Sequence, residues 1–463
     1  MKIKIFIILL FFVHQIYGQP DCECKTSIIN LSNKVENEYP GFIDKVEDSV
    51  LYKNFKNNLI KRAENTKEED CFEILQEYVK HFKDGHLQIT SNHVDNDELQ
   101  VIEMIKMKFT DYKKQVKKSE DKLAGIWTSG KYKVGILKID TIYHGLIFDC
   151  EYDNWNEGEV KFKIYPNRQA VIYNRNHILS FDSVQIVDNI AIKFLDLGMT
   201  FIKDFPESYN SNTDSIVQRA LGFYLDKLSK QTLYLKLSSF GYQHIETINS
   251  LIKNNHELLS SHKNLIIDVR GNGGGTDYAY RPIMKYLYSK PTRHIGADYY
   301  VTSTLIEGLS NWVETADKEK YADDIKEAQS DIKRMQGKIG QFIPYNPDAE
   351  FWVNEEDTVL KYPENIVILA DKFTASSAEK FIYNAKQSKK VKIMGTPTYG
   401  AMDYLSLREF DFSCDGYQLY MPTIRMSRLP DYPIDNIGIQ PDIYLDKFVE
   451  DWIEYAKEYI EYE

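Results

Sequence analysis

Two stretches decide the fold of this chain: LIIDVRGNGGG (Leu265–Gly275) and IVILADKFTASSAEKF (Ile366–Phe381). Each is a short apolar run that ends in very small residues, which is typical of a buried strand followed by a tight turn. The first turn holds three consecutive glycines, Gly273 to Gly275, whose backbone amides can approach a ligand closely. The second places Ser376 at the start of a predicted helix. A nucleophile and its oxyanion donors can be built from two such turns.

Strands and helices are predicted to alternate on both sides of these stretches, after Gln231. Strands are expected at 232–240, 265–269, 366–370 and 391–394, and helices at 245–252, 278–288 and 376–388. A last amphipathic helix carries Phe448, Trp452, Tyr455 and Tyr459 on its expected buried face. Alternation of this kind predicts a layered α/β core over residues 207–463.

The earlier part of the chain has two different patterns. From about Lys25 to Phe82 apolar residues recur at helical spacing, and the run ends in KDGHLQI (83–89), with His86 at the turn. Residues 19–120 are therefore expected to form a helical region that bears this DGH turn. Residues 121–206 contain short alternating runs separated by Gly, Asn and Asp, which predict a small antiparallel β domain or barrel.

The first 18 residues have the layout of a secretory signal peptide. A lysine-flanked start leads through IFIILLFFV to small residues before Gln19. The apolar run is only about a dozen residues, short of the roughly 20 that a membrane span needs. A secreted or periplasmic protein that does not span the membrane is expected.

Five cysteines are spread unevenly over the chain. In an oxidising compartment, one disulfide from Cys22 or Cys24 to Cys71 is expected, while Cys150 and Cys414 are remote. The spacing fits no zinc template. The net charge of −12, without a basic cluster, argues against a nucleic-acid partner. Peptides or small molecules remain open as ligands, and the sequence does not indicate an oligomeric state.

Each of the two small-residue turns also has a purely structural interpretation. A glycine-rich turn after a strand can simply be tight, and GNGGG lacks the Lys and Ser/Thr of a phosphate loop. Ser376 or Thr374 can serve only as a helix cap, because TASSAE resembles a capping box.

Five ordered blocks favour the catalytic interpretation. They are TLYLKLSSF, LIIDVRGNGGG, VILADKFTASSAEKF, GTPTYGA and IDNIGIQPDIYL. Their order and approximate spacing resemble those of the C-terminal processing (tail-specific) and tricorn-core serine peptidases. The resemblance implies a ClpP/crotonase-like layered core with Ser376 as nucleophile. It also implies an oxyanion hole formed by the backbone N–H groups of Gly273, Gly274 and Ser377, and it calls for no metal or organic cofactor.

The general base must be sought outside the position that the processing peptidases use. In that branch a lysine follows GxPTxG, whereas this chain has Ala401. Lys380 would need strong desolvation to act as a base. The tricorn branch uses an upstream histidine, and KDGHLQI resembles that element. His86 is therefore expected to be general base and acid, with His81 and His93 as competitors.

The partner of His86 is less clear from the sequence. Gly85 stands where the tricorn branch carries a serine, and Asp435 matches the late acidic residue of that branch. Asp435 is expected to orient His86, directly or through a hydroxyl. The alternative is that Asp435 caps a turn beside Asn436 and Gly438.

These residues predict an exported serine endopeptidase that acts on unfolded or peptide substrates. The β domain lacks a recognisable carboxylate-binding loop, so capture of free C-termini is not supported. A rival hypothesis is a non-catalytic binding protein on the same core, similar to the retinoid-binding modules of this fold family. A third is an acyl hydrolase for non-peptide esters or amides, which would use the same nucleophile.

Overall fold

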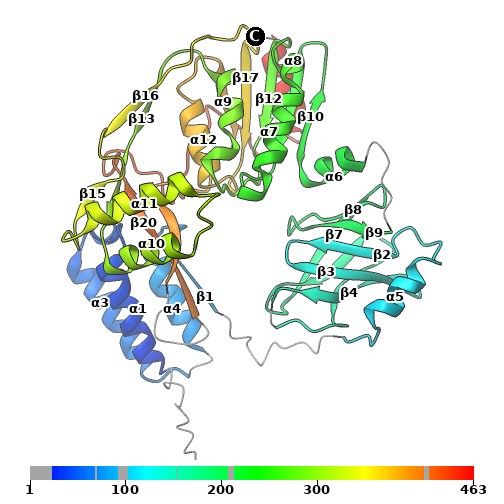
Figure 1. Cartoon of the computed structure of the whole chain (residues 1–463), viewed down its shortest axis with the longest axis horizontal. Helices are drawn as coiled ribbons and strands as arrows, with labels where there is room; N and C mark the ends of the chain where they lie inside the picture. The colour runs from blue at the N-terminus through cyan, green and yellow to red at the C-terminus, as the bar shows by residue number, and fades with distance from the viewer. Residues whose placement is uncertain are drawn as a thin grey trace, which may run out of the picture.

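A computed structural model describes residues 23–67, 70–91, 103–152, 154–206, 213–410 and 417–462. It contains a helical N-terminal region, a β-barrel and an α/β core (Figure 1). The predicted mixed α/β multi-domain fold is confirmed. The expected signal peptide, Cys22, His93 and Cys414 lie outside the described residues.

A six-stranded sheet forms the centre of the core, in the order β10-β11-β12-β17-β18-β21. Its strands are β10 (Phe223–Lys227), β11 (Thr232–Leu237), β12 (Asn264–Asp268), β17 (Asn365–Ala370), β18 (Val391–Gly395) and β21 (Ile443–Tyr444). All neighbours are parallel except β10 and β11. Since helices cover both faces, the central strands β12 and β17 are buried along almost their whole length.

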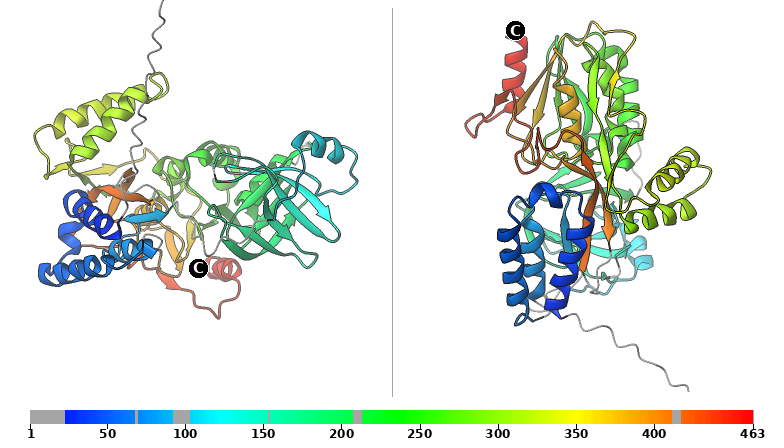
Figure 2. Two further views of the ribbon diagram at one scale, coloured as in Figure 1. Left: turned by 90° about the horizontal axis from the view of Figure 1, so that it is seen from below. Right: turned by 90° about the vertical axis from the view of Figure 1, so that its left-hand side faces the viewer.

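Helices α7 (Ile245–Asn254), α9 (Arg281–Leu287) and α12 (Ser377–Ala385) cover one face of the sheet, and α13 (Trp452–Tyr462) covers the other (Figure 2). Alternate residues of a strand serve the two faces. Ile267 packs with the first set of helices and Ile266 with α13. Phe448 was expected on the buried face of the last helix, but it precedes α13 and is 80% exposed.

The two small-residue turns meet because β12 and β17 are parallel neighbours in register. Asp268 pairs with Leu369, so the carboxyl ends of both strands lie at one edge of the sheet. Ligands of open α/β sheets bind at this edge. The glycine turn follows β12 and the Ser376 turn follows β17, and both are therefore delivered to one place.

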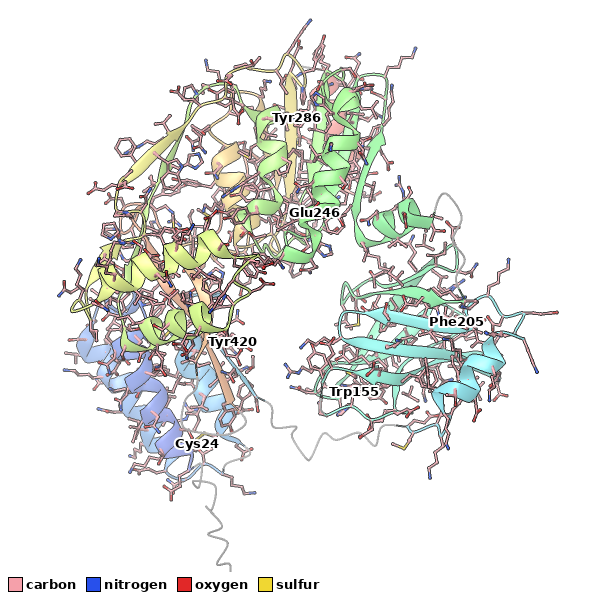
Figure 3. All side chains as sticks on the ribbon, in the orientation of Figure 1. Cys24, Trp155, Phe205, Glu246, Tyr286 and Tyr420 are labelled. Atoms are coloured by element: carbon pink, nitrogen blue, oxygen red, sulfur yellow. A yellow bond between two sulfur atoms is a disulfide. The ribbon has the colours of Figure 1, made fainter. Side chains whose placement is uncertain are left out.

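The N-terminal region consists of α1 (Cys24–Glu38), α2 (Phe42–Lys45), α3 (Ser49–Ala63) and α4 (Cys71–Lys80). Leu31, Leu59 and Leu75 are fully buried between these helices. The expected disulfide joins Cys24 to Cys71, with 5.3 Å between the Cα atoms, and Figure 3 labels Cys24. The disulfide therefore uses Cys24 rather than Cys22.

A short strand connects this helical region to the core. Strand β1 (Gln88–Ser91) pairs antiparallel with β20 (Tyr417–Met426), with Gln88 opposite Tyr420. Strand β20 also pairs with β14 (Ala297–Tyr300) and β19 (Tyr404–Phe410). The DGH turn immediately precedes β1, so this pairing places His86 against the core.

A closed barrel of eight strands stands beside the core (Figure 1). The strands are β2 (Gly125–Ser129), β3 (Tyr132–Ile139), β4 (Ile142–Cys150), β5 (Val160–Ile164), β6 (Gln169–Tyr173), β7 (Leu179–Val187), β8 (Ala191–Phe194) and β9 (Thr200–Phe205). Helix α5 (Phe109–Val116) packs on the barrel, where the Tyr112 hydroxyl contacts the carbonyls of Gly125 and Ile136. Because α5 packs on the barrel strands, the barrel domain includes residues before 121, the predicted start of this domain.

The remaining elements extend the core. Helices α10 (Ser303–Thr315) and α11 (Ala322–Met335) form a hairpin, and β15 (Phe342–Pro344) pairs with β14. Strands β13 (Thr292–Ile295) and β16 (Phe351–Asn354) form a two-stranded ribbon. Short helices are α6 (Thr213–Leu221), α8 (His256–Leu259), η2 (Tyr242–His244) and η3 (Asp277–Ala279). No helix in the described part of the chain has the length and apolar character needed to cross a membrane.

Candidate active site

Ser376 occupies an unusual backbone conformation at the start of α12. Its φ angle is 55°, in a region that residues other than glycine rarely adopt and that costs of order 1–3 kcal/mol. The side chain is partly exposed, and the backbone N–H donates a 2.9 Å hydrogen bond to Glu379 Oε2. Such a conformation persists only where the surroundings hold it, and the contacts of Glu379 show how.

Glu379 is fully buried and binds the nucleophile turn to the loop that contains GTPTYGA. Besides Ser376 N–H, it accepts hydrogen bonds from Thr398 Oγ1 at 2.5 Å, Gly400 N at 2.8 Å and Ala401 N at 2.9 Å. The carboxylate thus has four donors, which compensate for the loss of water around a buried charge. The TASSAE pattern predicted a capping box at the start of α12, but the link from Glu379 to residues 398–401 appears only in the structure.

The glycine turn lies directly against Ser376. Gly274 has a φ angle of +95°, and a Cβ atom there would lie 2.9 Å from Ser376 Cβ and 2.8 Å from Ser377 N. A side chain at this position would collide with the nucleophile turn, so glycine is required. At Gly273, by contrast, no atom lies within 4 Å of the Cβ position. An open space therefore begins at Gly273.

The three expected oxyanion donors are not equivalent. Gly274 N–H donates a 2.9 Å hydrogen bond to Asn272 Oδ1 and is therefore already engaged. Among the described residues, the N–H groups of Gly273 and Ser377 have no acceptor. This differs from the expectation that all three amides face the oxyanion, because that expectation did not include the side chain of Asn272.

Asn272 holds the glycine turn in place. Its side chain is fully buried and donates through Nδ2 to Leu237 O at 3.0 Å. Its backbone carbonyl accepts a hydrogen bond from Ala375 N at 3.0 Å, one residue before the nucleophile. Asn272 therefore joins β11, the glycine turn and the Ser376 turn. Its position inside GNGGG was the only available signal in the sequence.

Two neighbouring side chains have structural roles. The Thr374 hydroxyl donates to Val269 O at 3.0 Å and ties the end of β17 to that of β12. Lys380, the weak alternative base, forms a 2.5 Å ion pair with Asp277. Its ammonium is thus engaged by a carboxylate, whereas a general base must offer a lone pair to the serine hydroxyl.

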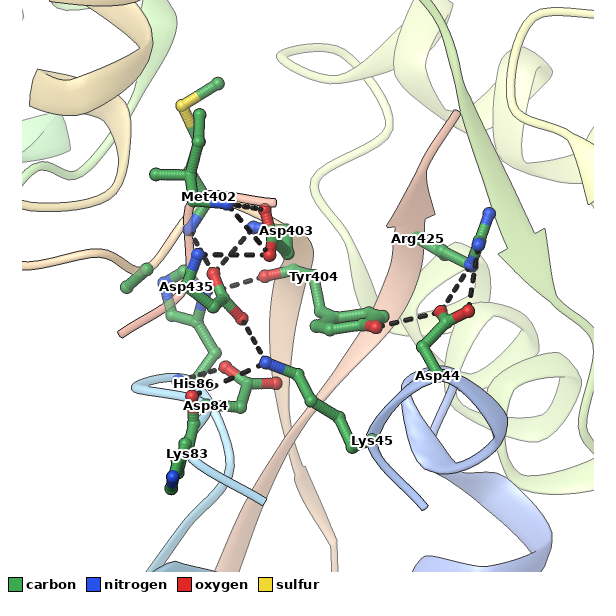
Figure 4. Close-up of polar contacts among 12 residues, drawn as sticks. Asp44, Lys45, Lys83, Asp84, His86, Met402, Asp403, Tyr404, Arg425 and Asp435 are labelled. Carbon is green, nitrogen blue, oxygen red and sulfur yellow. Dashed lines mark hydrogen bonds and ion pairs between the residues drawn. The ribbon is translucent and has the colours of Figure 1, made fainter. Parts of the chain in front are cut away.

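His86 has the tautomer that a general base needs. Its ring Nδ1 lies 2.7 Å from the backbone oxygen of Tyr404 (Figure 4). A carbonyl oxygen can only accept, so Nδ1 carries the proton and Nε2 of the neutral ring carries a lone pair. The backbone N–H of His86 donates to Asp84 Oδ1 at 2.8 Å, which fixes the turn.

The DGH turn packs against the loop that Glu379 binds. A Cβ atom on Gly85 would lie 2.5 Å from Tyr399 Cε1 and 3.1 Å from the Cβ of Ala401. His86 and Ser376 are thereby fixed to the same loop, although 290 positions separate them in the sequence. Within the described residues, no hydrogen bond joins the two side chains.

Asp435 was expected to orient His86 directly or through a hydroxyl, and no described hydrogen bond joins the two side chains. Its Oδ1 accepts hydrogen bonds from the backbone amides of Met402 and Asp403, both at 2.8 Å, and its Oδ2 lies 3.6 Å from Lys45 Nζ (Figure 4). The Tyr404 carbonyl is the group that orients His86. Asp435 thus holds the backbone at residues 402–403, rather than the turn beside Asn436 and Gly438 that the alternative interpretation named.

The pKa values of two carboxyl groups near His86 are raised by burial. Burial, together with the nearby charges of Asp84 and Asp403, raises the pKa of Asp435 to about 8, although Lys45 opposes this shift. Burial also raises the pKa of Asp84, against the favourable effect of His86 and of a 2.7 Å hydrogen bond from Tyr39. Perturbed carboxyl groups of this kind cluster at functional sites.

Asp268 supports the glycine turn from below. It is buried, and burial alone would raise its pKa. Hydrogen bonds and charges from Arg270 and Lys236 outweigh that effect and lower the pKa to about 2. This carboxylate stays charged and holds the end of β12.

Comparison with known proteins identifies the class of this site. The sequence profile of peptidase family S41 matches residues 231–445, which include both small-residue turns. These residues make up most of the α/β core, and the match confirms the predicted resemblance to the tail-specific peptidases. A comparison with curated protein sequences found no significant match.

Solved structures show the same fold over the whole chain. The crystal structure of mature CPAF is 15% identical and gives a TM-score of 0.50, with 95% of this chain and 96% of that chain covered. The structure of mature CPAF complexed with lactacystin is also 15% identical and gives a TM-score of 0.51, with 95% and 98% covered. At this identity the likeness concerns the fold alone.

Proposed function

We propose that this chain is an exported serine endopeptidase that cleaves unfolded polypeptides through an acyl-enzyme on Ser376. One observation carries the proposal. Ser376 has a positive φ angle at the mouth of α12 and is packed against Gly274, with the unengaged amides of Gly273 and Ser377 beside it. A serine in this setting has a rigid backbone and hydrogen-bond donors at hand.

Acylation follows from these residues. His86 Nε2 takes the proton from Ser376 Oγ as the oxygen attacks the carbonyl carbon of the scissile bond. The amides of Gly273 and Ser377 stabilise the negative charge that develops on the carbonyl oxygen, which is worth about 3 to 4 kcal/mol per donor. His86 then gives its proton to the leaving amine. Water, activated by His86, releases the acyl group and restores the serine.

Export is part of the proposal and has two sources of support. Residues 1–18 have the layout of a signal peptide. The Cys24–Cys71 disulfide is a feature of proteins that fold in oxidising compartments. A secreted or periplasmic location agrees with both.

Labelling with a fluorophosphonate and hydrolysis of unfolded casein test the assignment together. We expect Ser376→Ala to abolish labelling and to reduce hydrolysis by about 10⁴-fold or more. Ser377→Ala is the matched control, because the neighbouring residue contributes only its backbone N–H. Wild-type hydrolysis by the purified Ser376→Ala variant would overturn the proposal.

A non-catalytic binding protein is the second candidate. The observation in its favour is that no described hydrogen bond joins His86 to Ser376. Catalytic hydrogen bonds are often long in unliganded sites and shorten when substrate binds, which is why the peptidase is preferred. A wild-type protein that fails to label, yet binds peptides tightly, would favour the binding function.

A further inference from the structure

A cavity of about 470 Å³ lies among the elements that follow the two small-residue turns. Three elements line it: helix α9, helix α12 and the β13–β16 ribbon, which Figure 1 shows as an arch at the outer side of the two helices. Its wall includes Tyr280, Met284, Tyr288, His294, Trp352 and Asn384. We call this cavity the α9–α12 pocket.

The pocket begins next to the proposed nucleophile. The glycine turn continues into Asp277, and the Ser376 turn continues into Lys380, and these two residues form a 2.5 Å ion pair that lines the pocket. A rise of 1.5 Å per residue places Lys380 about 6 Å and Asn384 about 12 Å along α12 from Ser376. An extended peptide advances about 3.3 Å per residue, so the pocket lies roughly two to four residues from the scissile bond.

The outer wall of the pocket is a pair of stacked rings. Trp352 stacks on His294 with 5.4 Å between ring centroids and 8° between planes. Burial, helped by the charge of Lys380, lowers the pKa of His294, so the imidazole is neutral at neutral pH. Asn354 Nδ2 lies 3.1 Å from His294 Nε2 and holds the ring. The result is a flat, uncharged aromatic surface that faces α12.

The charges in the wall cancel. Asp277 pairs with Lys380, and the remaining charged side chains are one base, Arg281, and one acid, Glu356. The Arg281 guanidinium lies 4.0 Å from the centre of the Tyr278 ring. A charged ligand side chain therefore meets both signs, whereas a planar apolar ring can pack on Trp352 and on the apolar side chain of Met284, which also lines the pocket.

We propose that the α9–α12 pocket binds a large aromatic side chain of the substrate polypeptide, which stacks on Trp352. This inference rests on the proposed peptidase function and names a substrate class for it. The selected residue lies two to four positions from the bond that is cut.

A peptide library that varies one position at a time tests the pocket. Trp352→Ala should lower kcat/KM about three- to tenfold for peptides with an aromatic residue at the selected position, and leave aliphatic peptides unchanged. Phe351→Ala is the matched control. It lies on the same exposed strand, where alternation turns its side chain away from the pocket. Equal losses across the library, or a preference for acidic residues that Arg281→Gln removes, would overturn the inference.

Binding separates this inference from the peptidase proposal. In the Ser376→Ala protein, calorimetry should show that a phenylalanine-containing peptide binds about three- to tenfold more weakly after Trp352→Ala is added. Binding that depends on Trp352, in a wild-type protein without hydrolytic activity, would support the pocket and refute the peptidase. Hydrolysis without any aromatic preference would support the peptidase and refute the pocket.

Discussion

The two halves of the candidate site are held in different ways. On the nucleophile side, the buried carboxylate of Glu379 receives four hydrogen bonds, three of them from backbone amides. On the base side, Asp435 lies near Asp84, and its buried Oδ2 has no hydrogen-bond partner among the described residues. The first half is fully hydrogen-bonded, and the second contains a carboxyl group that gains a proton.

This difference predicts that the His86 half is more sensitive than the Ser376 half to substitution and to pH. The Ser376 turn follows a strand of the parallel sheet and is held by the buried side chains of Glu379 and Asn272. The His86 turn comes from the helical region and depends on β1, the disulfide and titratable side chains. Variants in each half therefore test this difference, through their effects on activity and on the free energy of unfolding.

The largest effect is expected from His86→Gln. Loss of the general base should reduce kcat by about 10²- to 10⁴-fold while the protein stays folded, since glutamine cannot take the serine proton. His81→Gln is the control. It is a histidine of the same region that stacks on Phe55, with 4.3 Å between ring centroids. Comparable losses in both variants would show that His86 has no special role.

Removal of the Cys24–Cys71 disulfide should destabilise the base side alone. The two cysteines are 47 residues apart, and release of a loop of that length costs about 4 kcal/mol in the chain-entropy account. Urea unfolding of the Cys24→Ser, Cys71→Ser double variant should show a separate early transition of the helical region. Cys150→Ser, at the free cysteine, should leave the curve unchanged. A double variant that unfolds like the wild type would contradict the distinction.

Glu379→Gln tests the nucleophile side. Each carboxylate oxygen of Glu379 accepts two hydrogen bonds. In the glutamine variant, an NH₂ group replaces one of these oxygens in either orientation of the amide, and it faces two donors with which it cannot form hydrogen bonds. We expect the free energy of unfolding in urea to fall by about 3 kcal/mol. Glu409→Gln, an exposed position on β19, is the control and should change stability by less than about 0.5 kcal/mol. A tolerated Glu379→Gln variant would mean that four hydrogen bonds are not what fixes Ser376.

The last comparison concerns pH and Asp435. Its folded-state pKa of about 8 exceeds the unfolded value of about 3.9. Between these values the folded state holds a proton that the unfolded state has lost. The free energy of unfolding therefore falls as the pH rises from about 4 to 8, by up to about 1.4 kcal/mol per unit.

Asp435→Asn removes this titration. The variant should lose less stability than the wild type between pH 5 and pH 8 in urea unfolding. Asp431→Asn, at an exposed aspartate nearby, should keep the wild-type slope. Parallel curves for the wild type and Asp435→Asn would show that the carboxyl group is charged throughout this range.

The sequence predicts the core well because its signals are local. Apolar runs that end in small residues define β12 and β17, and their parallel pairing brings Gly274 to Ser376 without further information. The path of His86 is different. It depends on a four-residue strand, β1, that pairs with β20 more than 300 positions away in the sequence. No local sequence pattern predicts this pairing.

Side-chain hydrogen bonds account for the other differences. The use of Gly274 N–H by Asn272 and the capping of the 402–403 turn by Asp435 are tertiary contacts. Phe448 fits the helical period of the last helix, but the Asp451 side chain accepts from Ile453 N and Glu454 N and starts the helix after it. Periodicity locates a helix, whereas a cap decides where it begins.

The acceptor that orients His86 is the main-chain carbonyl of Tyr404. No side-chain replacement deletes a carbonyl, so an alanine scan of this chain would pass over the group that sets the tautomer of its histidine. Chemical synthesis reaches it: an ester in place of the amide between Tyr404 and Leu405 weakens that oxygen as an acceptor and leaves every side chain intact.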